Sequence, residues 1–373
     1  MKKINLKKTF LNADWILIFV TLVLVIFGII MVYSASYYTA EIYYNNKFYF
    51  FTKQIIGAVL GVCAMVVFSK IDYHLYQKYK NLIMILCLVL LVLVFVPYIG
   101  VSNNGSSRWI NLFFFTIQPS ELAKFGFVVF VAAYLSKNFD IVKTFKGILP
   151  VLCFGGLICL LIILEPNMSI TMCVGFTMLV MLFVGGARAK HFALLAVPII
   201  LIVVVLILIE PYRLNRLVAF INPWANPQNE GYQLIQSLYS LGAGGLFGVG
   251  LFNSRQKFLF LPFSESDFIF SIVGEELGFL GCLALMICFG IIIYRGIKIA
   301  IHSVDRFGCY LASGIVAIIG TQVLINIAAV TGSIPPTGVP LPFISAGGTS
   351  LVAFMSALGV LLSIRKQTLN LKI

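Results

Sequence analysis

Long apolar runs, separated by short polar segments, repeat along almost the whole chain. Most runs approach the ~20 residues that a helix needs to cross the ~30 Å hydrocarbon core of a bilayer. The pattern predicts an all-α integral membrane protein with about ten transmembrane helices, forming a single polytopic domain over residues 1–373. The expected spans are 15–34, 54–69, 81–98, 119–136, 147–165, 168–186, 191–209, 268–294, 308–331 and 347–364.

The amino-acid composition supports a membrane protein. Of the 373 residues, 61% are hydrophobic and 10% are charged, whereas soluble domains carry about 25% charged residues. The 8 cysteines lie in or beside apolar runs and form no CxxC pair, so the sequence predicts neither a disulfide framework nor a zinc site. The first apolar run is longer than the core of a signal peptide, and we interpret it as a retained span.

The basic residues predict how the chain sits in the membrane. If the N-terminus is cytoplasmic, the inner segments are 1–14, 70–80, 137–146, 187–191, 295–307 and 365–373. These segments hold 18 of the 26 Lys and Arg residues, in agreement with the positive-inside rule. Both termini are therefore expected in the cytoplasm. Topology then accounts for the net charge of +13, and we expect no nucleic-acid partner.

A large outer loop, residues 210–267, is expected between the seventh and eighth spans. It is longer than an ordinary connection, which favours a functional role. Within it, YQLIQSLYSL at 232–241 places apolar residues at helical spacing, as in a helix that lies in the membrane interface. The Pro- and Gly-rich segment 331–350 is expected to be a second non-helical region. Backbone of this kind beside a membrane must be buried or line a cavity, so we predict a re-entrant loop that faces substrate.

The end of the large outer loop carries the first candidate chemical group, Asp267. It directly precedes the eighth span, so its carboxylate is either a helix N-cap or a reactive group. Glu275 and Glu276 lie about two turns further along, at membrane depth, where ionisable groups are usually functional or ion-paired. Snorkelling toward the interface is the alternative for this pair.

A second polar region surrounds the start of the fourth span. Pro119 suits the first residue of a helix, and Glu121 complements the positive end of that helix. Glu121 and Lys124 are three residues apart and can pair on one helix face. The pattern fits a capped helix with an internal ion pair and fits a substrate site equally well. Arg108, followed by Trp109, is either an interfacial anchor or an anion ligand.

Of the eight basic residues expected on the outer side, six cluster there although the positive-inside bias disfavours them. An anionic group such as a pyrophosphate would explain their presence. They are Arg108, Lys124, Arg213, Arg216, Arg255 and Lys257. Glu165 and Glu210 each end a span before a proline, and both are compatible with plain boundary residues as well as with a site.

Six segments carry a family resemblance. SSRWINL, IQPSELAK, AFINPW, GYQLIQSLYSLGAGGLFGVGL, SDFIFSIVGEELG and TGVPLPFISAGGTS follow one another along the chain. Together they resemble the SEDS family (shape, elongation, division and sporulation), the FtsW/RodA/SpoVE group of bacterial membrane proteins, and they look closest to its FtsW/SpoVE branch. PFSESD stands where the family commonly has PEAHTD, EPNMSI where it has a QPDLGT-like segment, and ISAGG where it has ISYGG. These departures concern substrate handling rather than the fold.

The resemblance implies a peptidoglycan glycosyltransferase that polymerises lipid II at the outer face of the bacterial cell membrane, for division or sporulation. It assigns the family's essential aspartate to Asp267, which we expect to act as a general base. The candidate substrate-binding residues are Arg108, Trp109, Gln118, Glu121, Lys124, Arg213, Arg216, Arg255, Lys257, Glu275, Glu276 and Ser345.

The expected partners are a class B penicillin-binding protein, lipid II, undecaprenyl pyrophosphate and membrane lipid. All three histidines fall in inner segments, so outer acid–base chemistry must use carboxylates. A divalent cation is a candidate cofactor, and a carboxylate site would suit Mg²⁺ or Mn²⁺. Two other functions stay open, namely a flippase for lipid II and a non-catalytic scaffold for a penicillin-binding protein.

Overall fold

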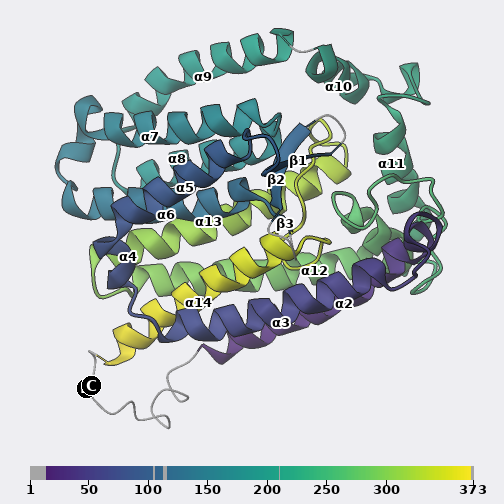
Figure 1. The fold of residues 1–373 in the computed structure, drawn as a ribbon, viewed down its shortest axis with the longest axis horizontal. Coiled ribbons are helices and arrows are strands. Elements are labelled where there is room, and N and C mark those ends of the chain that lie inside the picture. The colour runs from purple at the N-terminus through teal and green to yellow at the C-terminus, as the bar shows by residue number, and fades with distance from the viewer. Residues whose placement is uncertain (1–13, 104–105, 112–115, 210, 371–373) are drawn as a thin grey trace.

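The computed structural model describes residues 14–103, 106–111, 116–209 and 211–370, and its long helices run roughly side by side (Figure 1). Each predicted span coincides with one of them. These helices are α2 (Trp15–Tyr44), α3 (Tyr49–Lys70), α5 (Lys80–Leu93), α6 (Pro119–Lys137), α7 (Phe145–Leu164), α8 (Met168–Val184), α9 (Ala189–Ile209), α12 (Ile269–Ile301), α13 (Arg306–Val330) and α14 (Gly348–Asn370).

Within the described residues, eight of these helices are long and apolar enough to cross a membrane. α5 and α8 are shorter apolar helices of 14 and 17 residues. The predicted class, a polytopic helical membrane protein, is therefore confirmed. The passage of α5 and α8 through the whole bilayer, and with it the number of ten spans, stays a prediction.

The connections contain short elements that the spacing of apolar residues did not predict. Three strands form an antiparallel sheet in the order β1–β2–β3, in which Val101 pairs with Trp109, so the fold is not purely helical. The short elements are α4 (His74–Lys78), β1 (Gly100–Asn103), β2 (Ser106–Asn111), β3 (Thr116–Ile117), η1 (Ile141–Lys143), α10 (Pro211–Ile221), η2 (Pro223–Ala225) and α11 (Tyr232–Gly244).

The helix predicted at 232–241 is present as α11, but its environment differs from the expectation. Instead of lying only at a membrane interface, α11 packs against α12 and buries Leu234, Ile235, Ser237 and Ser240. The hydroxyl of Ser237 lies 2.7 Å from that of Ser271 on α12. The polar positions of α11 therefore face a helix, because serine pairs replace water as hydrogen-bond partners there.

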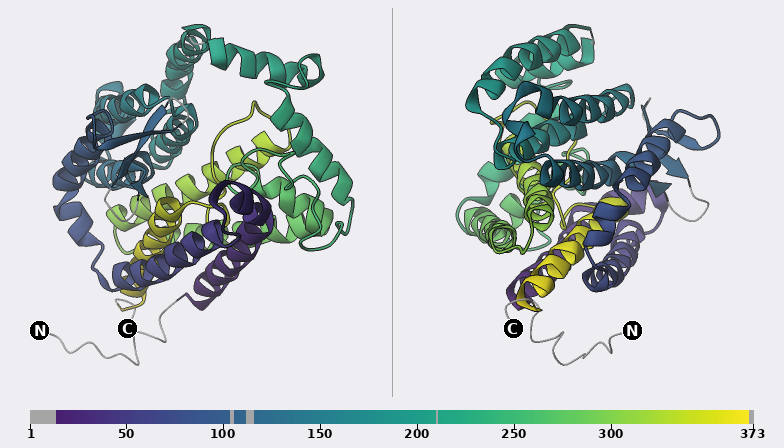
Figure 2. Two further views of the ribbon diagram at one scale, coloured as in Figure 1. Left: turned by 45° about the vertical axis from the view of Figure 1, so that its right-hand side comes forward. Right: turned by 90° about the vertical axis from the view of Figure 1, so that its left-hand side faces the viewer.

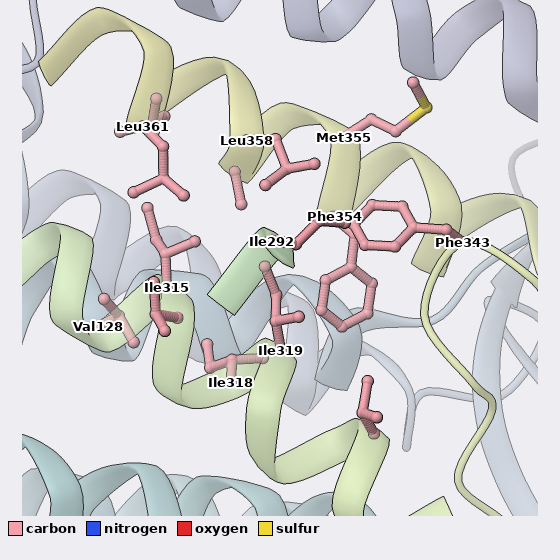
Figure 3. Packing of buried hydrophobic residues seen from close by; sticks show 14 of the residues in the cluster. Val128, Ile292, Ile315, Ile318, Ile319, Phe343, Phe354, Met355, Leu358 and Leu361 are labelled. Atoms are coloured by element: carbon pink, nitrogen blue, oxygen red, sulfur yellow. The ribbon is translucent and has the colours of Figure 1, made fainter. Parts of the chain in front are cut away.

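The hydrophobic core surrounds α13, which packs against α6, α8, α12 and α14. Figure 3 shows Ile315 and Ile319 of α13 beside Val128 of α6 and Phe354 and Leu358 of α14, all of them buried. α14 also lies closely along α3, where a Cβ atom added to Gly61 would overlap the Met355 sulfur. Small residues permit this close approach of two membrane helices.

α9 is the exception to this packing. Its apolar side chains are almost all exposed, with 6% of its most hydrophobic stretch buried. Figures 1 and 2 show α9 apart from the other long helices, joined to α8 at one end and leading toward α10 at the other. In a membrane, this exposed apolar surface would contact lipid, since little protein covers it.

The two ends of the helix bundle differ in content (Figure 1). One end holds the small sheet, α10, α11 and the non-helical segments 245–268 and 331–347, and the other holds α4, η1 and the turn between α8 and α9. At the first end, α12 has a non-helical residue, Gly278, at φ 68°. The opened turn bonds to the 245–250 segment, since Val249 N donates to Glu275 O at 2.9 Å and Phe279 N to Gly245 O at 2.8 Å. The glycines of this segment allow the close approach.

Candidate functional site

Asp267 lies two residues before the start of α12, and hydrogen bonds from residues 345–346 and from α13 hold the main chain around it. Three successive carbonyl groups accept hydrogen bonds from outside the segment. Glu265 O accepts from Ala346 N at 2.9 Å, and Ser266 O accepts from Ser345 Oγ at 2.5 Å. Asp267 O accepts from Asn326 Nδ2 at 2.8 Å. The position of the Asp267 side chain is therefore set through its backbone.

The carboxylate of Asp267 does not cap α12. The N-cap residue of α12 is Phe268, and no side chain caps that end of the helix. Asp267 is partly exposed, whereas its backbone partner Asn326 is buried. Of the two interpretations that the sequence left open for Asp267, the N-cap is wrong, because the helix begins one residue later than a cap at 267 would require.

Two amide side chains of α13 donate hydrogen bonds to the main chain around Asp267 and in the 331–347 loop. Asn326 Nδ2 also donates to Val339 O at 2.7 Å, and Gln322, one turn earlier, donates to Pro340 O at 2.9 Å. Residues four apart on a helix share a face, so the two amides form one polar column under the 331–347 loop. This loop is non-helical and partly buried as predicted, because side-chain amides replace the missing intrahelical partners.

Two guanidinium groups lie close to Asp267. Arg108, from β2, donates from Nε to Glu165 O at 3.2 Å and from Nη2 to Pro166 O. Arg216, from α10, donates from Nη1 to Pro336 O at 3.1 Å. Burial is the largest influence on Asp267 and, with the nearby Glu265 carboxylate, raises its pKa to about 6, against the opposing effect of both arginines. Asp267 thus titrates close to neutral pH, as a general base should.

A second carboxyl group, Glu165, lies behind Arg108 in the connection between α7 and α8. It is fully buried, and neither of its carboxyl oxygens has a hydrogen-bond partner in the described part of the chain. Burial raises the pKa of Glu165 to about 8, although Arg108 opposes the rise. At neutral pH this group is mostly uncharged, so it does not neutralise Arg108.

Four of the predicted site residues form two buried ion pairs. Lys124 Nζ lies 3.1 Å from Glu121 Oε1, with both side chains 1% exposed, and it also donates to Gln322 Oε1 at 2.5 Å. Lys257 Nζ lies 3.0 Å from Glu276 Oε1, and both of these side chains are 0% exposed. In each pair the opposite charge and further hydrogen bonds limit the cost of burial, although Glu276 Oε2 has no hydrogen-bond partner among the described residues.

Similarity to known proteins identifies the family of this chain. Residues 14–370 match the FtsW, RodA and SpoVE family model, described as cell cycle protein. The chain belongs to the FtsW/RodA/SpoVE family. It is 43% identical to Stage V sporulation protein E of Bacillus subtilis over 96% of this chain and 98% of that protein. It is 38% identical to a probable peptidoglycan glycosyltransferase FtsW of Geobacter metallireducens, over 97% and 96% of the two chains.

Two solved structures share this fold. One comes from a study of the structural coordination of polymerization and crosslinking by a peptidoglycan synthase complex. It has a TM-score of 0.78 and 26% identity over 95% of this chain and 98% of that chain. The rod shape determining protein RodA of Thermus thermophilus has a TM-score of 0.71 and 24% identity over 95% and 97% of the two chains.

The FtsW/RodA/SpoVE motifs that lie far apart in sequence converge at one end of the bundle. Arg108, Asp267 and Ser345 come from three different motifs, and Arg216 comes from the helix that leads into a fourth, AFINPW; these residues meet there. Ser345 is buried and its hydroxyl bonds to Ser266 O and to Leu341 N, which places it in the support of the loop. Its predicted contact with substrate stays a prediction.

The remaining predicted residues do not gather around Asp267. Glu275 accepts hydrogen bonds from Arg255 N at 2.8 Å and from Ser254 Oγ at 2.5 Å, so it holds the outer segment, as Glu276 does through Lys257. The ion-paired alternative fits Glu276, since both acids are buried and do not snorkel. The Arg255 side chain is exposed. Trp109 lies on β2 and Gln118 directly precedes α6, whereas Glu210 and the side chain of Arg213 lie outside the described residues.

Sequence reasoning missed three supporting residues. Asn326 and Gln322 are amides within an apolar span, at a four-residue spacing that is itself a signal of a shared polar face. Gln54 in α3 is buried, donates to Ser345 O at 3.2 Å and accepts from Gly347 N at 3.5 Å. The sequence left open whether Glu165 is a plain boundary residue. The feature that pointed to a site is that Glu165 stands where the family commonly has a glutamine.

The structure does not favour a preformed metal site. Among the described residues, no three Asp, Glu, His or Cys side chains gather as metal ligands. The groups beside Asp267 are one further carboxylate and two guanidinium groups, a donor set that would not hold Mg²⁺ or Mn²⁺ by itself. The requirement for a divalent cation stays a prediction.

Proposed function

We propose that this chain is a peptidoglycan glycosyltransferase that polymerises lipid II, and that Asp267 is its general base. The single observation that carries this proposal is the placement of Asp267. Three successive carbonyls, of residues 265 to 267, are hydrogen-bonded to other segments, while the Asp267 carboxylate lies near two guanidinium groups. The FtsW relatives are named peptidoglycan glycosyltransferases, which supports the same reaction.

The chemistry requires activation of a sugar hydroxyl. Asp267 accepts the proton of the acceptor's 4-hydroxyl group as that oxygen forms a bond to C1 of the donor. The bond between C1 and the pyrophosphate oxygen breaks, and undecaprenyl pyrophosphate leaves with the electron pair. A positioned base of this kind contributes ~10²–10⁴-fold to the rate.

The leaving group carries negative charge, which Arg108 and Arg216 are placed to stabilise. Both positive charges are near enough to Asp267 to lower its pKa, and arginine binds phosphate through several N–H donors. Of the six outer basic residues considered from sequence, Lys124 and Lys257 are engaged in buried ion pairs. We assign the phosphate-binding role to Arg108 and Arg216 because their charges act on Asp267, whereas the exposed Arg255 lies in the segment that Glu275 holds.

The chain is expected to work in the bacterial cell membrane beside a class B penicillin-binding protein. The structure described as a peptidoglycan synthase complex supports such a partner, since the two folds agree over 95% of this chain. The start of α2 and the end of α14 lie at the bundle end opposite to the sheet (Figure 1). Together with the basic inner segments, this supports cytoplasmic termini and an outer Asp267.

The deciding experiment measures glycan formation from purified lipid II by wild type and by Asp267→Asn. Each is assayed with and without a cognate class B synthase whose own chemistry is blocked. We expect polymer from the wild type and a rate about 10²–10⁴-fold lower from the variant, at an equal thermal midpoint. Glu230→Gln, which changes an exposed acid of the outer segment, is the matched control and should retain activity.

The outcomes separate the competing functions. Full activity in Asp267→Asn would show that another group is the base. If wild type makes no polymer with a verified partner and added Mg²⁺ or Mn²⁺, the glycosyltransferase proposal fails, and lipid II translocation and partner binding become the next assays. Chelation of divalent cations in an active preparation tests the metal requirement, since a rate that survives chelation would exclude it.

A further inference from the structure

The end of the bundle opposite to Asp267 contains a basic cavity. The cavity has a volume of about 440 Å³ and opens between the first turns of α7 and α9. Lys143, Arg188 and Lys190 line it together with the aromatic rings of Phe145 and His191, and none of its described lining residues is acidic. Its charge therefore suits an anion.

The length of α7 places this cavity relative to the membrane. α7 has 20 residues, which at ~1.5 Å per residue span ~30 Å, the thickness of the hydrocarbon core. Its first turn borders the cavity, and its last turn leads to Glu165 beside Arg108. The cavity and the Asp267 site therefore lie in opposite headgroup layers, whichever side is outer.

The cations of the cavity are poorly compensated within the described chain. Arg188 and Lys190 have no acidic partner there, and the acid nearest to Lys143 is Asp140, an exposed residue at 3.6 Å. Arg188 also precedes the first turn of α9, where His191 N donates to Arg188 O at 2.9 Å. The positive end of a 21-residue helix thus adds to the three side-chain charges, and helix starts bind phosphate groups well.

His191 supplies an independent sign of a ligand. Its side chain is 5% exposed, and its Nδ1 has no hydrogen-bond partner in the described part of the chain. Buried polar atoms are nearly always paired, and a bound anion would provide the missing partner. Phe145 contacts the imidazole at a ring-centroid distance of 6.3 Å, which holds the ring against the cavity wall.

The surface beyond the cavity is apolar rather than aqueous. Leu194, Val197 and Leu201 of α9 are 59%, 69% and 63% exposed, and their spacing places them on one helix face that leads from the cavity into the membrane. A free phosphate would not use this surface, whereas acyl chains would lie along it.

We propose that the cavity binds the phosphate of an anionic phospholipid in the leaflet opposite to Asp267, with its acyl chains along Leu194, Val197 and Leu201. Lys143, Arg188 and Lys190 supply the positive charge, and His191 donates a hydrogen bond to a phosphate oxygen. This site is separate from the glycosyltransfer reaction and stands or fails independently of it.

Native mass spectrometry of the full chain in detergent tests the proposal, with dioleoylphosphatidylglycerol and dioleoylphosphatidylcholine as probes. The wild type should bind the anionic lipid at least about tenfold more tightly. The triple variant Lys143→Gln, Arg188→Gln, Lys190→Gln should lose about a hundredfold in affinity for it, because each cation near an anionic headgroup contributes roughly fivefold. Affinity for the zwitterionic lipid should change little.

A matched triple variant, Lys70→Gln, Lys78→Gln, Lys298→Gln, removes the same charge from exposed positions at the same end of the bundle. It should keep the preference for the anionic lipid. His191→Phe retains a ring and should weaken binding severalfold at an unchanged thermal midpoint, so the site can be tested even if the triple variant folds poorly.

Three results would overturn the proposal. Equal affinity of wild type for the two lipids would exclude an anion site, and equal losses in the two triple variants would reduce it to general surface charge. Displacement of the lipid by millimolar inorganic phosphate would show that the cavity takes free phosphate and that the apolar face of α9 is not used.

Discussion

Asp267 and the pair Glu275–Glu276 lie within ten residues of one another, yet protein donors bond to different groups in the two places. Around Asp267, protein donors bond to the backbone, and the residue as a whole is partly exposed. Around Glu275 and Glu276, protein donors bond to the carboxylates themselves, and both side chains are buried.

This contrast distinguishes the proposed base from the two acids that hold the outer segment. A carboxylate whose oxygens accept several protein hydrogen bonds is stabilised in place and has little capacity left for a substrate. A carboxylate positioned through its main chain keeps its oxygens available. Proximity to the membrane and acidity alone do not separate the two cases, because both features are shared by all three residues.

The largest expected effect is a loss of stability when Glu276 is replaced. Glu276→Gln removes the partner of a fully buried Lys257, and breaking a buried ion pair from one side costs about 3–5 kcal/mol. Thermal denaturation in detergent should show a much lower midpoint than for wild type or for Asp267→Asn.

Two controls sharpen this first prediction. Glu41→Gln breaks an exposed pair with Lys47 at 3.4 Å, and it should cost about 0–1 kcal/mol. Adding Lys257→Met to Glu276→Gln should recover part of the loss, since the unpaired charge is then gone. An Asp267→Asn protein as unstable as Glu276→Gln would contradict the contrast between the two acids.

The next effect concerns the positioning of Asp267. Asn326→Leu removes the hydrogen bonds to Asp267 O and Val339 O. It should lower kcat by about ten- to a hundredfold with little change in KM, because small displacements of a catalytic group have effects of this size. Initial rates of lipid II polymerisation measure both constants.

A double variant separates positioning from general damage. If Asn326 acts through Asp267, adding Asn326→Leu to Asp267→Asn should lower the residual rate no further, as residues in one network are not additive. Thr177→Val, which removes a buried bond within α8 to Cys173 O at 2.7 Å, should leave the rate unchanged. Additive losses in the double variant would show that Asn326 is only structural.

A pH profile tests the charge state of the site. The pKa of Asp267 is raised to about 6, and a base must be deprotonated, so the rate should fall about tenfold per unit below that pH. Above it the rate should be level until Glu165 ionises, at a pKa of about 8. Glu265→Gln removes a neighbouring negative charge and should move this fall to lower pH. A rate that stays level down to pH about 4, the ordinary value for Asp, would contradict the assignment.

Glu165 should define the alkaline side of the same profile. Its pKa is raised to about 8, so above that pH it ionises and neutralises Arg108, which weakens the hold on pyrophosphate. Glu165→Gln, which introduces the residue common in the family, should remove the alkaline decline. An unchanged decline in this variant would assign it to another group.

The smallest expected effect is at Ser345. Its hydroxyl accepts from Leu341 N at 2.7 Å and donates to Ser266 O at 2.5 Å. Ser345→Ala removes these two hydrogen bonds, each with a net contribution of about 0.5–1.5 kcal/mol, and should lower the thermal midpoint slightly with a severalfold lower kcat. The substrate-binding prediction for Ser345 instead requires a raised KM at unchanged stability, so the two roles are separable.

The sequence predicted Asp267 as the candidate base but not the residues that hold it. Asp267 stands out because it is an acid at the end of a span within a family motif. Its support comes from Asn326 and Ser345, and the bonds cross 59 and 79 residues of sequence. Such contacts depend on how helices pack, and no local pattern encodes them. Likewise, the basic residues looked equivalent in sequence until packing buried Lys124 and Lys257.

What the sequence determined by itself is the series of apolar helices and their order. In hydrocarbon a helix satisfies its own backbone hydrogen bonds, so each span depends on its own residues, and every predicted span coincides with a helix. What the tertiary structure decided is the environment of each polar group. Whether a carboxylate is buried, paired or exposed depends on donors from distant segments, and these contacts set both its desolvation and its pKa.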